Sequence, residues 1–388
     1  MCEACDIEVL AKDLQRRKTP DSASAVGKGK LVELKEVAEN LEANCLVYDG
    51  ELRGSQMAAI ADLTDLKVLD RTLLILDIFA RRANTAEGVL QVEIAQLQDR
   101  LTRLSGSGQA LSRLGGGIGT RGPGESQLES DRRHIQRRIT TLSKKLKQQR
   151  KRRQNLRSQR KQKNSYVFAV CGYTNAGKSS LINALCHSDL AAFDQVFATL
   201  DPRLRRLPVE GPDILISDTV GLIRRLPHEL VEAFQATLDE VREADYIIQV
   251  SDLSDPEVEK HKEVTDRLIQ DLDAADKPRI HVLNKIDCIP LPLRPNVQAY
   301  YDPKTEITEI AVSVKENIGL ELLQKQILDL VSRDWREAEL LIDYARQEQL
   351  AYLKENSWIE TINFEDEGSR VKFKAPPAVL AKLQIYKS

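Results

Sequence analysis

The chain has little cysteine and few aromatic residues, with six cysteines and 5% aromatics among 388 residues. So few cysteines cannot form a disulfide framework over this length, and we expect reduced thiols and a cytoplasmic protein. No apolar run approaches the roughly 18 residues that a membrane-spanning helix needs. The first twenty residues include Glu3, Asp6, Glu8, Lys12 and Asp13, so we expect no secretory signal. The length corresponds to about two to four domains.

Acidic residues are absent from one long segment. Residues 132–163 contain no aspartate or glutamate but 15 lysines and arginines. The rest of the chain carries 42 basic and 59 acidic residues, a net charge of −17 that the overall value of −2 conceals. A cationic segment this dense indicates a polyanionic partner, and a solvated linker is the alternative.

The N-terminal residues alternate helical and extended patterns. Apolar residues have helical spacing over residues 31–41 and 57–63, and short apolar strands are predicted at residues 45–48 and 67–69. This alternation favours a parallel sheet, and we expect a small α/β domain over residues 1–84.

Residues 85–163 have the periodicity of two packed helices. Their apolar residues recur every three or four positions; they include Leu90, Ile94, Leu97, Leu101, Leu104, Leu128, Ile135, Ile139, Leu142, Leu146 and Leu156. The sequence GGGIGTRGPG at residues 115–124 separates the two series and cannot continue a helix. We therefore predict a basic helical hairpin over residues 85–163 with a glycine-rich tip at residues 115–124.

The alternation of strands and helices returns after residue 164. Strands are predicted at residues 166–170, 214–216, 246–250, 280–283 and 310–312. Their order predicts a doubly wound α/β domain over residues 164–333. The tail at residues 340–388 predicts a small α+β domain, with a helix at residues 340–353 and another after Pro376-Pro377.

A phosphate-binding motif follows the first strand of the predicted doubly wound domain. Residues 172–179 read GYTNAGKS, which fits the pattern G-x-x-x-x-G-K-[ST] at the start of an apolar helix. The backbone N–H groups of such a loop surround phosphates. Lys178 would reach the β- and γ-phosphates, and the Ser179 hydroxyl would bind Mg²⁺. The predicted nucleotide-binding residues here are Gly172, Tyr173, Thr174, Asn175, Ala176, Gly177, Lys178, Ser179 and Ser180.

A second phosphate signal follows the strand at residues 214–216. In the sequence Asp218-Thr-Val-Gly221, the carboxylate of Asp218 would hold Mg²⁺. The backbone N–H of Gly221 would approach the γ-phosphate. Thr199, which precedes this strand, would bind Mg²⁺ and the γ-phosphate in a segment ordered by GTP, or would lie in an ordinary surface loop.

Two further signals concern the base. Asn284-Lys285-Ile-Asp287 follows the strand at residues 280–283. The Asp287 carboxylate would accept hydrogen bonds from the N1–H and 2-amino groups of guanine, a donor pair that adenine lacks. Ser313 and Val314 follow the next strand and would close a loop on the guanine oxygen.

Leu222 stands where many GTPases have the glutamine that orients the attacking water. Leucine cannot orient water, so we predict slow hydrolysis by the isolated protein. A partner or another residue would complete the site. His228 is one conceivable helper, although an ordinary surface histidine is the simpler interpretation.

Together these residues resemble the HflX family of ribosome-associated GTPases, and the similarity covers nearly the whole chain. Its most distinctive part is GGGIGTRGPGESQLE at residues 115–129, and residues 27–30, 197–202 and 218–223 are also similar. The resemblance implies a GTPase that binds the large (50S) ribosomal subunit and its 23S rRNA, and that splits 70S ribosomes or rescues stalled ones. It implies that Thr199 is a Mg²⁺ ligand. Met1 aligns within the family's first helix, so by this resemblance either the start is misassigned or the N-terminal sheet is one strand short.

The leading hypothesis is a Mg²⁺-dependent GTPase that is monomeric off the ribosome and has no DNA partner. Its predicted catalytic residues are Lys178, Thr199 and Gly221, and its predicted Mg²⁺ ligands are Ser179, Thr199 and Asp218. The low aromatic content favours contacts with RNA backbone and shape over base stacking. The alternative is a GTP-regulated RNA or protein assembly module that uses the hairpin as an adaptor. A metal or redox site at Cys2-x-x-Cys5 is less favoured, because no second pair follows at zinc-finger spacing.

Overall fold

The computed structural model describes residues 1–83, 85–114, 123–161, 165–187, 204–219 and 238–385. These residues form two compact units, an N-terminal unit within residues 1–152 and a C-terminal unit from residue 153 onward. The four-domain division predicted from the sequence is finer than this and stays a prediction. None of the described helices is both long enough and apolar enough to cross a membrane.

The N-terminal unit contains a small α/β layer, as predicted. Strands β1 (Cys45–Tyr48) and β2 (Lys67–Asp70) pair in parallel, and they follow helices α1 (Lys28–Asn40) and α2 (Gly54–Thr64) respectively. Leu31, Ile60 and Val68 form a buried core between these elements. A short helix, η1 (Glu3–Cys5), precedes them.

Helix α3 (Arg71–Arg82), which the sequence analysis did not predict, begins directly after β2. The side chain of Asp70 caps it by accepting a hydrogen bond from the backbone N–H of Leu73 at 3.0 Å. Asp70 is 1% exposed and also accepts from the N–H of Leu52. One buried carboxylate therefore ends β2, starts α3 and holds the loop after β1.

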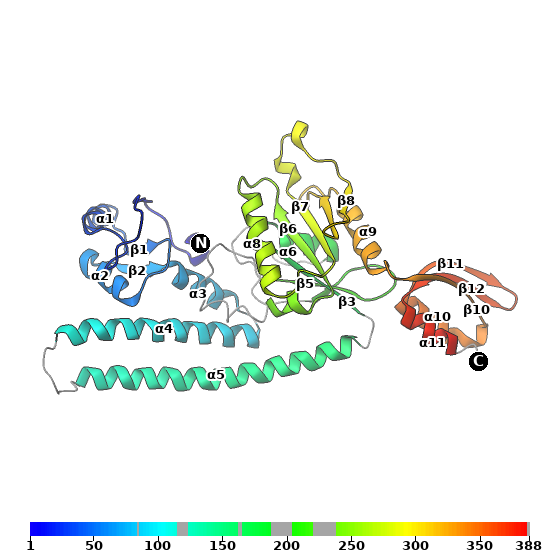
Figure 1. Cartoon of the computed structure of the whole chain (residues 1–388), viewed down its shortest axis with the longest axis horizontal. Helices are drawn as coiled ribbons and strands as arrows, with labels where there is room; N and C mark the ends of the chain where they lie inside the picture. Colours follow the sequence, from blue (N-terminus) through cyan, green and yellow to red (C-terminus); the bar gives the residue numbers. More distant parts are fainter. Residues whose placement is uncertain (84, 115–122, 162–164, 188–203, 220–237, 386–388) are drawn as a thin grey trace. The chain divides into compact units, whose positions relative to one another are not determined.

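Two long helices complete the N-terminal part of the chain: α4 (Ala86–Leu114) and α5 (Pro123–Lys161) (Figure 1). The helical hairpin predicted from the periodicity is present, since Arg138 of α5 forms an ion pair with Glu93 of α4 at 2.8 Å. Ile94 of α4 and Ile135 and Leu142 of α5 are buried. The glycine-rich tip predicted at residues 115–124 falls largely outside the described residues.

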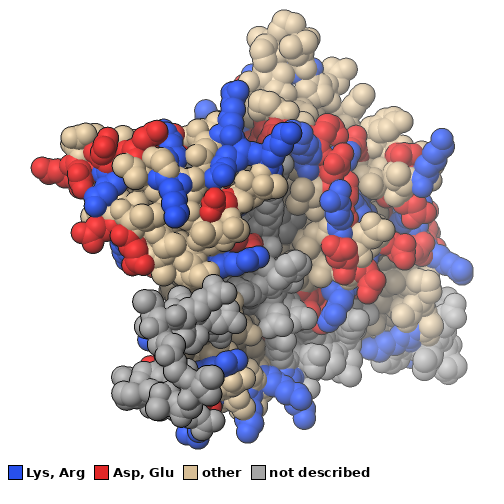
Figure 2. Space-filling view, turned by 60° about the vertical axis from the view of Figure 1, so that its left-hand side comes forward, with Lys and Arg blue, Asp and Glu red and all other residues tan. Residues whose placement is uncertain are grey.

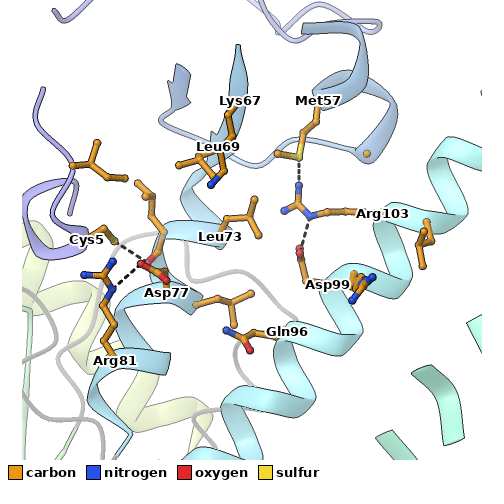
Figure 3. A pocket seen from close by; sticks show the side chains of 16 residues that line it. Cys5, Met57, Lys67, Leu69, Leu73, Asp77, Arg81, Gln96, Asp99 and Arg103 are labelled. Carbon is orange, nitrogen blue, oxygen red and sulfur yellow. Dashed lines mark hydrogen bonds and ion pairs between the residues drawn. The ribbon is translucent and has the colours of Figure 1, made fainter. Parts of the chain in front are cut away.

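A cavity of about 860 Å³ lies on the face of β2 that points toward α3 and α4 (Figure 3). Arg103 of α4 fixes one wall: its guanidinium donates to Asp70 at 3.1 Å and to Asp99 at 2.7 Å, and it contacts the sulfur of Met57. On the opposite side Arg81 pairs with Asp77. Of these ion pairs, the one between Arg103 and Asp70 connects α4 to the small sheet.

The C-terminal unit contains a seven-stranded sheet in the order β4-β5-β3-β6-β7-β9-β8. Its five central strands are parallel and match the five strands predicted from the sequence: β3 (Tyr166–Gly172), β5 (Ile214–Asp218), β6 (Tyr246–Asp252), β7 (Arg279–Asn284) and β9 (Ile307–Ala311). The edge strands β4 (Leu204–Arg206) and β8 (Ala299–Asp302) are antiparallel and were not predicted.

Helices cover both faces of this sheet, which confirms the doubly wound prediction. Val170 and Ile248 pack on one face with α6 (Lys178–Cys186) and α9 (Leu320–Val331). Ala169 and Ile247 point to the other face, where they pack with Ile269 of α8 (Val258–Asp271) (Figure 1). Both faces of the central strands are therefore buried, as parallel sheets require.

The tail forms an antiparallel sheet in the order β10-β12-β11 with two helices. Its elements are β10 (Arg336–Ile342), α10 (Gln347–Asn356), β11 (Trp358–Glu365), β12 (Gly368–Ala375) and α11 (Pro377–Ile385), with a short helix η4 (Tyr344–Arg346) before α10. The predicted helix at residues 340–353 was wrong at its start, because Leu340 and Ile342 belong to β10. Ala338, Leu340 and Ile342 pack on the core of Val371, whereas the residues between them are exposed, so a period of two prevails there.

Candidate nucleotide-binding site

The polar residues predicted to bind nucleotide lie at one edge of the seven-stranded sheet. Gly172 ends β3, Asp218 ends β5 and Asn284 ends β7, while Ser313 follows β9 by two residues. These strands are parallel, so their carboxyl ends meet at the same edge. In doubly wound folds this is the edge where ligands bind.

The phosphate-binding loop connects β3 to α6 and ends at the helix N-terminus. Asn175 and Gly177 have φ values of 65° and 90°, which turn the backbone sharply before Lys178 starts α6. A Cβ atom on Gly177 would lie 2.3 Å from Nδ2 of Asn284. Gly177 is therefore required both by its backbone conformation and by the close approach of Asn284. Thr174 lies in the same loop and Ser180 in the first turn of α6.

Lys178 is held inside this loop rather than in solvent. Its side-chain amine donates to the backbone oxygens of Gly172 at 3.0 Å and Tyr173 at 2.7 Å, and only 7% of the residue is exposed. Burial lowers the pKa of Lys178 to about 8, because the charged amine loses its hydration. The loop therefore holds a cation at the N-terminus of α6.

Ser179 and Asp218 supply the predicted metal-binding oxygens. The Ser179 hydroxyl donates to Oδ2 of Asp218 at 3.1 Å, and Asp218 is 1% exposed at the end of β5. A hydroxyl oxygen and a carboxylate oxygen side by side are a donor set that suits Mg²⁺. Thr199 and Gly221 lie outside the described residues, as do Leu222 and His228.

Asn284 joins three segments that are far apart in the sequence. Its Nδ2 donates to the backbone oxygen of Ala176 in the phosphate-binding loop at 2.9 Å. Its Oδ1 accepts from the backbone N–H of Val314 at 3.3 Å. Asn284 is 2% exposed, so these bonds form away from water. The residue thus acts as a brace between the phosphate loop and the two predicted base loops.

Asp287 and Ser313 form the predicted base-binding pair. The Ser313 hydroxyl donates to Oδ1 of Asp287 at 2.7 Å and accepts from the backbone N–H of Glu316 at 3.1 Å. The hydrogen bond from Ser313 holds the pKa of Asp287 below its usual range. Asp287 is therefore a carboxylate at neutral pH, which is the form that accepts hydrogen bonds from guanine.

Two contacts at this edge were missed by the sequence analysis. The side-chain amine of Lys285 forms an ion pair with Asp252 at 2.8 Å. The rings of Tyr173 and His261 stack with centroids 3.7 Å apart. Asp252 ends β6, so the rule that located Asp218 and Asn284 would also have located Asp252. The stacking of Tyr173 on α8 had no sequence signal.

In the Cys2-x-x-Cys5 pair, Cys5 has a structural role. Cys5 is 4% exposed, and its thiol donates to the backbone oxygen of Leu74 at 3.5 Å. Burial raises the pKa of the Cys5 thiol, which makes it less nucleophilic. Within the described ranges no group of three or more His, Cys, Asp or Glu residues is placed to hold a metal ion.

Replacing Gly177 with alanine is expected to weaken GTP binding about tenfold or more. The added Cβ would displace Asn284, and a non-glycine residue at this φ is strained by about 1–3 kcal/mol. Titration with a fluorescent GTP analogue would measure the loss. Gly29→Ala is the matched control, because a Cβ on Gly29 would meet nothing within 4 Å. Equal affinity of the two variants would show that this close approach does not matter for binding.

The chain is similar to known GTPase families and to a solved structure. Three family models match the chain: "GTP-binding GTPase N-terminal" over residues 1–80, "GTP-binding GTPase Middle Region" over residues 82–160, and "50S ribosome-binding GTPase" over residues 167–285. Among solved structures, a GTP-binding protein of Sulfolobus solfataricus in complex with GDP is similar over 85% of this chain and 93% of its own length. Its identity is 24% and the TM-score is 0.46.

Curated relatives are similar over most of the chain. "GTPase HflX" of Caldanaerobacter subterraneus subsp. tengcongensis is 43% identical over 381 residues, which cover 98% of this chain and 86% of that protein. "GTPase HflX" of Escherichia coli is 42% identical over 290 residues, covering 72% of this chain and 68% of that protein. With the phosphate-binding loop and the base-binding motifs at one sheet edge, and with relatives this similar over nearly its whole length, the chain belongs to the HflX family of GTPases.

Proposed function

We propose that this GTPase binds GTP and Mg²⁺ at the carboxyl edge of its seven-stranded sheet and docks on the large ribosomal subunit through the basic helix α5. The observation that carries the proposal is the network around Asn284 and Asp287. Their side chains contact Ala176, Ser313 and Val314, so direct hydrogen bonds connect the phosphate loop to both base loops.

On the phosphate side of the site we propose a role for each residue. Lys178 neutralises charge on the β- and γ-phosphates, and Ser179 and Asp218 hold Mg²⁺. When bound, the ion neutralises phosphate charge that develops during transfer to water. Thr199 and Gly221 complete this set by resemblance to the family, as a Mg²⁺ ligand and as a γ-phosphate contact.

The base side of the site is tested by Asp287→Asn. The substitution removes an anionic acceptor that faces two guanine donors, and each bond to a charged group contributes about 1.5–3 kcal/mol. We expect GTP affinity to fall about 100-fold or more and XTP affinity to rise, because the amide pairs with the carbonyl that xanthine has in place of the amino group. Competition binding with GTP and XTP measures both.

Asp276→Asn is the matched control for this experiment, since Asp276 is an exposed carboxylate of the same unit. It removes the same charge without touching the base loops. Unchanged GTP affinity in the Asp287 variant would remove that residue from the base site.

The charge on α5 supports an RNA partner. Lys144, Lys145, Lys147, Lys151 and Arg152 are all exposed. Figure 2 shows several basic side chains at the bottom of the view. Contacts between such a helix and RNA phosphates are strong and depend on salt. The family model that matches residues 167–285 is described as a 50S ribosome-binding GTPase, which names the RNA-rich partner that we propose.

The adaptor alternative requires an apolar face that is free to bind another helix. On the described part of α5, Ile135 and Leu142 are 6% and 1% exposed, because they pack within the chain. These two apolar residues of α5 are therefore used within the chain, whereas the described lysines of the helix remain exposed for a partner. Cosedimentation with 50S particles in a sucrose gradient, lost as salt rises, separates the two functions.

The rest of the proposed function concerns the RNA contact, the action on ribosomes and the place in the cell. The 23S rRNA is the direct contact, 70S particles are split or rescued, and the protein acts in the cytoplasm. Leu222 leaves the isolated site without a water-orienting glutamine, so a ribosomal partner accelerates hydrolysis. We also propose the four-domain division, with the hairpin at residues 85–163 as the ribosome-binding arm.

A further inference from the structure

We propose that Arg294 is a positioning residue for guanine recognition, because it holds the peptide of Asp287 in place; this inference rests on the role proposed above for Asp287. Arg294 follows two short helices, η2 (Ile286–Cys288) and η3 (Leu291–Leu293), in the loop after β7. Its Nη2 donates to the backbone oxygen of Asp287 at 2.8 Å, and its Nε donates to the backbone oxygen of Ile289 at 2.8 Å.

The position of this side chain differs from that of its neighbours. Leu291 and Leu293 are 77% and 75% exposed, whereas the Arg294 side chain is 25% exposed. An arginine in a surface loop ordinarily keeps its guanidinium in water. Here the guanidinium turns inward and pairs with carbonyl groups at the end of η2, where helical bonding leaves oxygens unpaired.

A second contact closes a ring around the carboxylate. Nη1 of Arg294 lies 3.9 Å from Oε2 of Glu316. The backbone N–H of Glu316 donates to the Ser313 hydroxyl, which in turn donates to Asp287. Arg294 thus fixes the main chain of Asp287 while Ser313 fixes its side chain, and Glu316 connects the two.

This ring matters because two-point recognition depends on orientation. The Asp287 carboxylate has to present both acceptors to guanine N1–H and to the 2-amino group at once. A displacement of about 1 Å at a binding group is enough to lose much of its effect. Arg294 makes no contact with the base in this assignment, so its loss should reduce discrimination without removing a contact group.

Comparing GTP with ITP tests this role, since hypoxanthine lacks the 2-amino group. In Arg294→Ala we expect GTP affinity to fall about tenfold and ITP affinity to fall less, so the GTP/ITP ratio decreases. Arg294→Lys keeps one donor group at this position and should recover part of the ratio. Leu293→Ala, an exposed neighbour in the same loop, should match the wild type. Thermal unfolding of the nucleotide-free full-length variants checks that each is folded.

Equal losses for GTP and ITP in Arg294→Ala would overturn the proposal, since they would indicate general loosening of the loop. So would GTP and ITP affinities that both match the wild type. A second measurement separates this inference from the proposed function. If Asp287→Ala reduces the ratio and Arg294→Ala adds nothing in that background, the two residues act through one another. If Asp287→Ala leaves the ratio unchanged, the assignment of the base site itself fails.

Discussion

Replacing Lys178 with alanine is expected to abolish detectable GTP hydrolysis and to weaken GTP binding at least about 100-fold. The amine lies within the phosphate loop, bonded to the backbone oxygens of Gly172 and Tyr173, and it supplies the positive charge that the β- and γ-phosphates meet. Charge-assisted hydrogen bonds contribute about 1.5–3 kcal/mol each. The loss of two such bonds from the amine to the phosphates accounts for a factor of this size. Phosphate release and fluorescent-nucleotide titration measure the two effects.

The matched control is Lys325→Ala, which removes an exposed lysine from α9 of the same unit. It should leave both hydrolysis and binding unchanged. Circular dichroism tests whether the Lys178 variant keeps its fold, because the amine also closes the loop without nucleotide. A folded Lys178 variant that still hydrolyses GTP at the wild-type rate would contradict the assignment of the phosphate site.

Reversing four charges on α5 is expected to weaken binding to 50S particles more than any substitution outside that helix. Fourteen of the 15 cations of residues 132–163 lie on α5, whose 39 residues span about 58 Å. If about six of them meet RNA phosphates, log affinity should fall with log salt at a slope of about −4 to −5. Changing Lys144, Lys147, Lys151 and Arg152 to glutamate should reduce the affinity and flatten this slope.

The control for this experiment reverses four exposed cations elsewhere, at Lys12, Arg16, Lys18 and Lys28. It changes the net charge by the same amount and leaves α5 intact. Sedimentation with 50S particles over a series of salt concentrations compares the two variants. GTP affinity should stay the same in both. Binding that does not depend on salt, or equal binding by the two variants, would favour the solvated linker over the RNA-binding helix.

The sequence predicted the central strands well because their pattern is simple. β3, β5, β6, β7 and β9 are buried on both faces and appear as short apolar runs between helical patterns. The edge strands β4 and β8 have no such pattern. Their sequences are Leu-Arg-Arg and Ala-Tyr-Tyr-Asp. These strands form because they pair with a neighbouring strand, and not because their side chains are buried.

The two errors in local structure have different causes. Helix α3 begins where the side chain of Asp70 accepts a hydrogen bond from a backbone N–H. The sequence does not show which aspartate caps a helix, because Asp70 becomes buried only when β2 joins the sheet. The start of α10 was misassigned because Leu340, Leu341 and Ile342 form a short continuous apolar run, which does not distinguish a helix from a strand. The pairing with β12 decides for the strand.

The candidate site was predictable to the extent that each residue follows its own strand. Asp218, Asn284, Asp287 and Ser313 were located by that rule, and the structure brings Asn284 to the phosphate loop. The sequence could not show that Arg294 turns back to Asp287, because a loop between two strands has no periodicity to read. The roles of Thr199 and Gly221 rest on motif and resemblance.

GTP turnover with and without saturating 50S particles tests the central claim most directly. The site supplies Lys178, Ser179 and Asp218 but has leucine at position 222, so a partner has room to accelerate hydrolysis; a missing arginine finger alone costs about 10³–10⁵ in other GTPases. We predict slow turnover by the isolated protein and at least a tenfold, saturable increase with 50S particles. The increase should vanish in Lys178→Ala and require more particles in the α5 variant. Turnover by the isolated protein at the rate seen with saturating 50S particles would contradict the account.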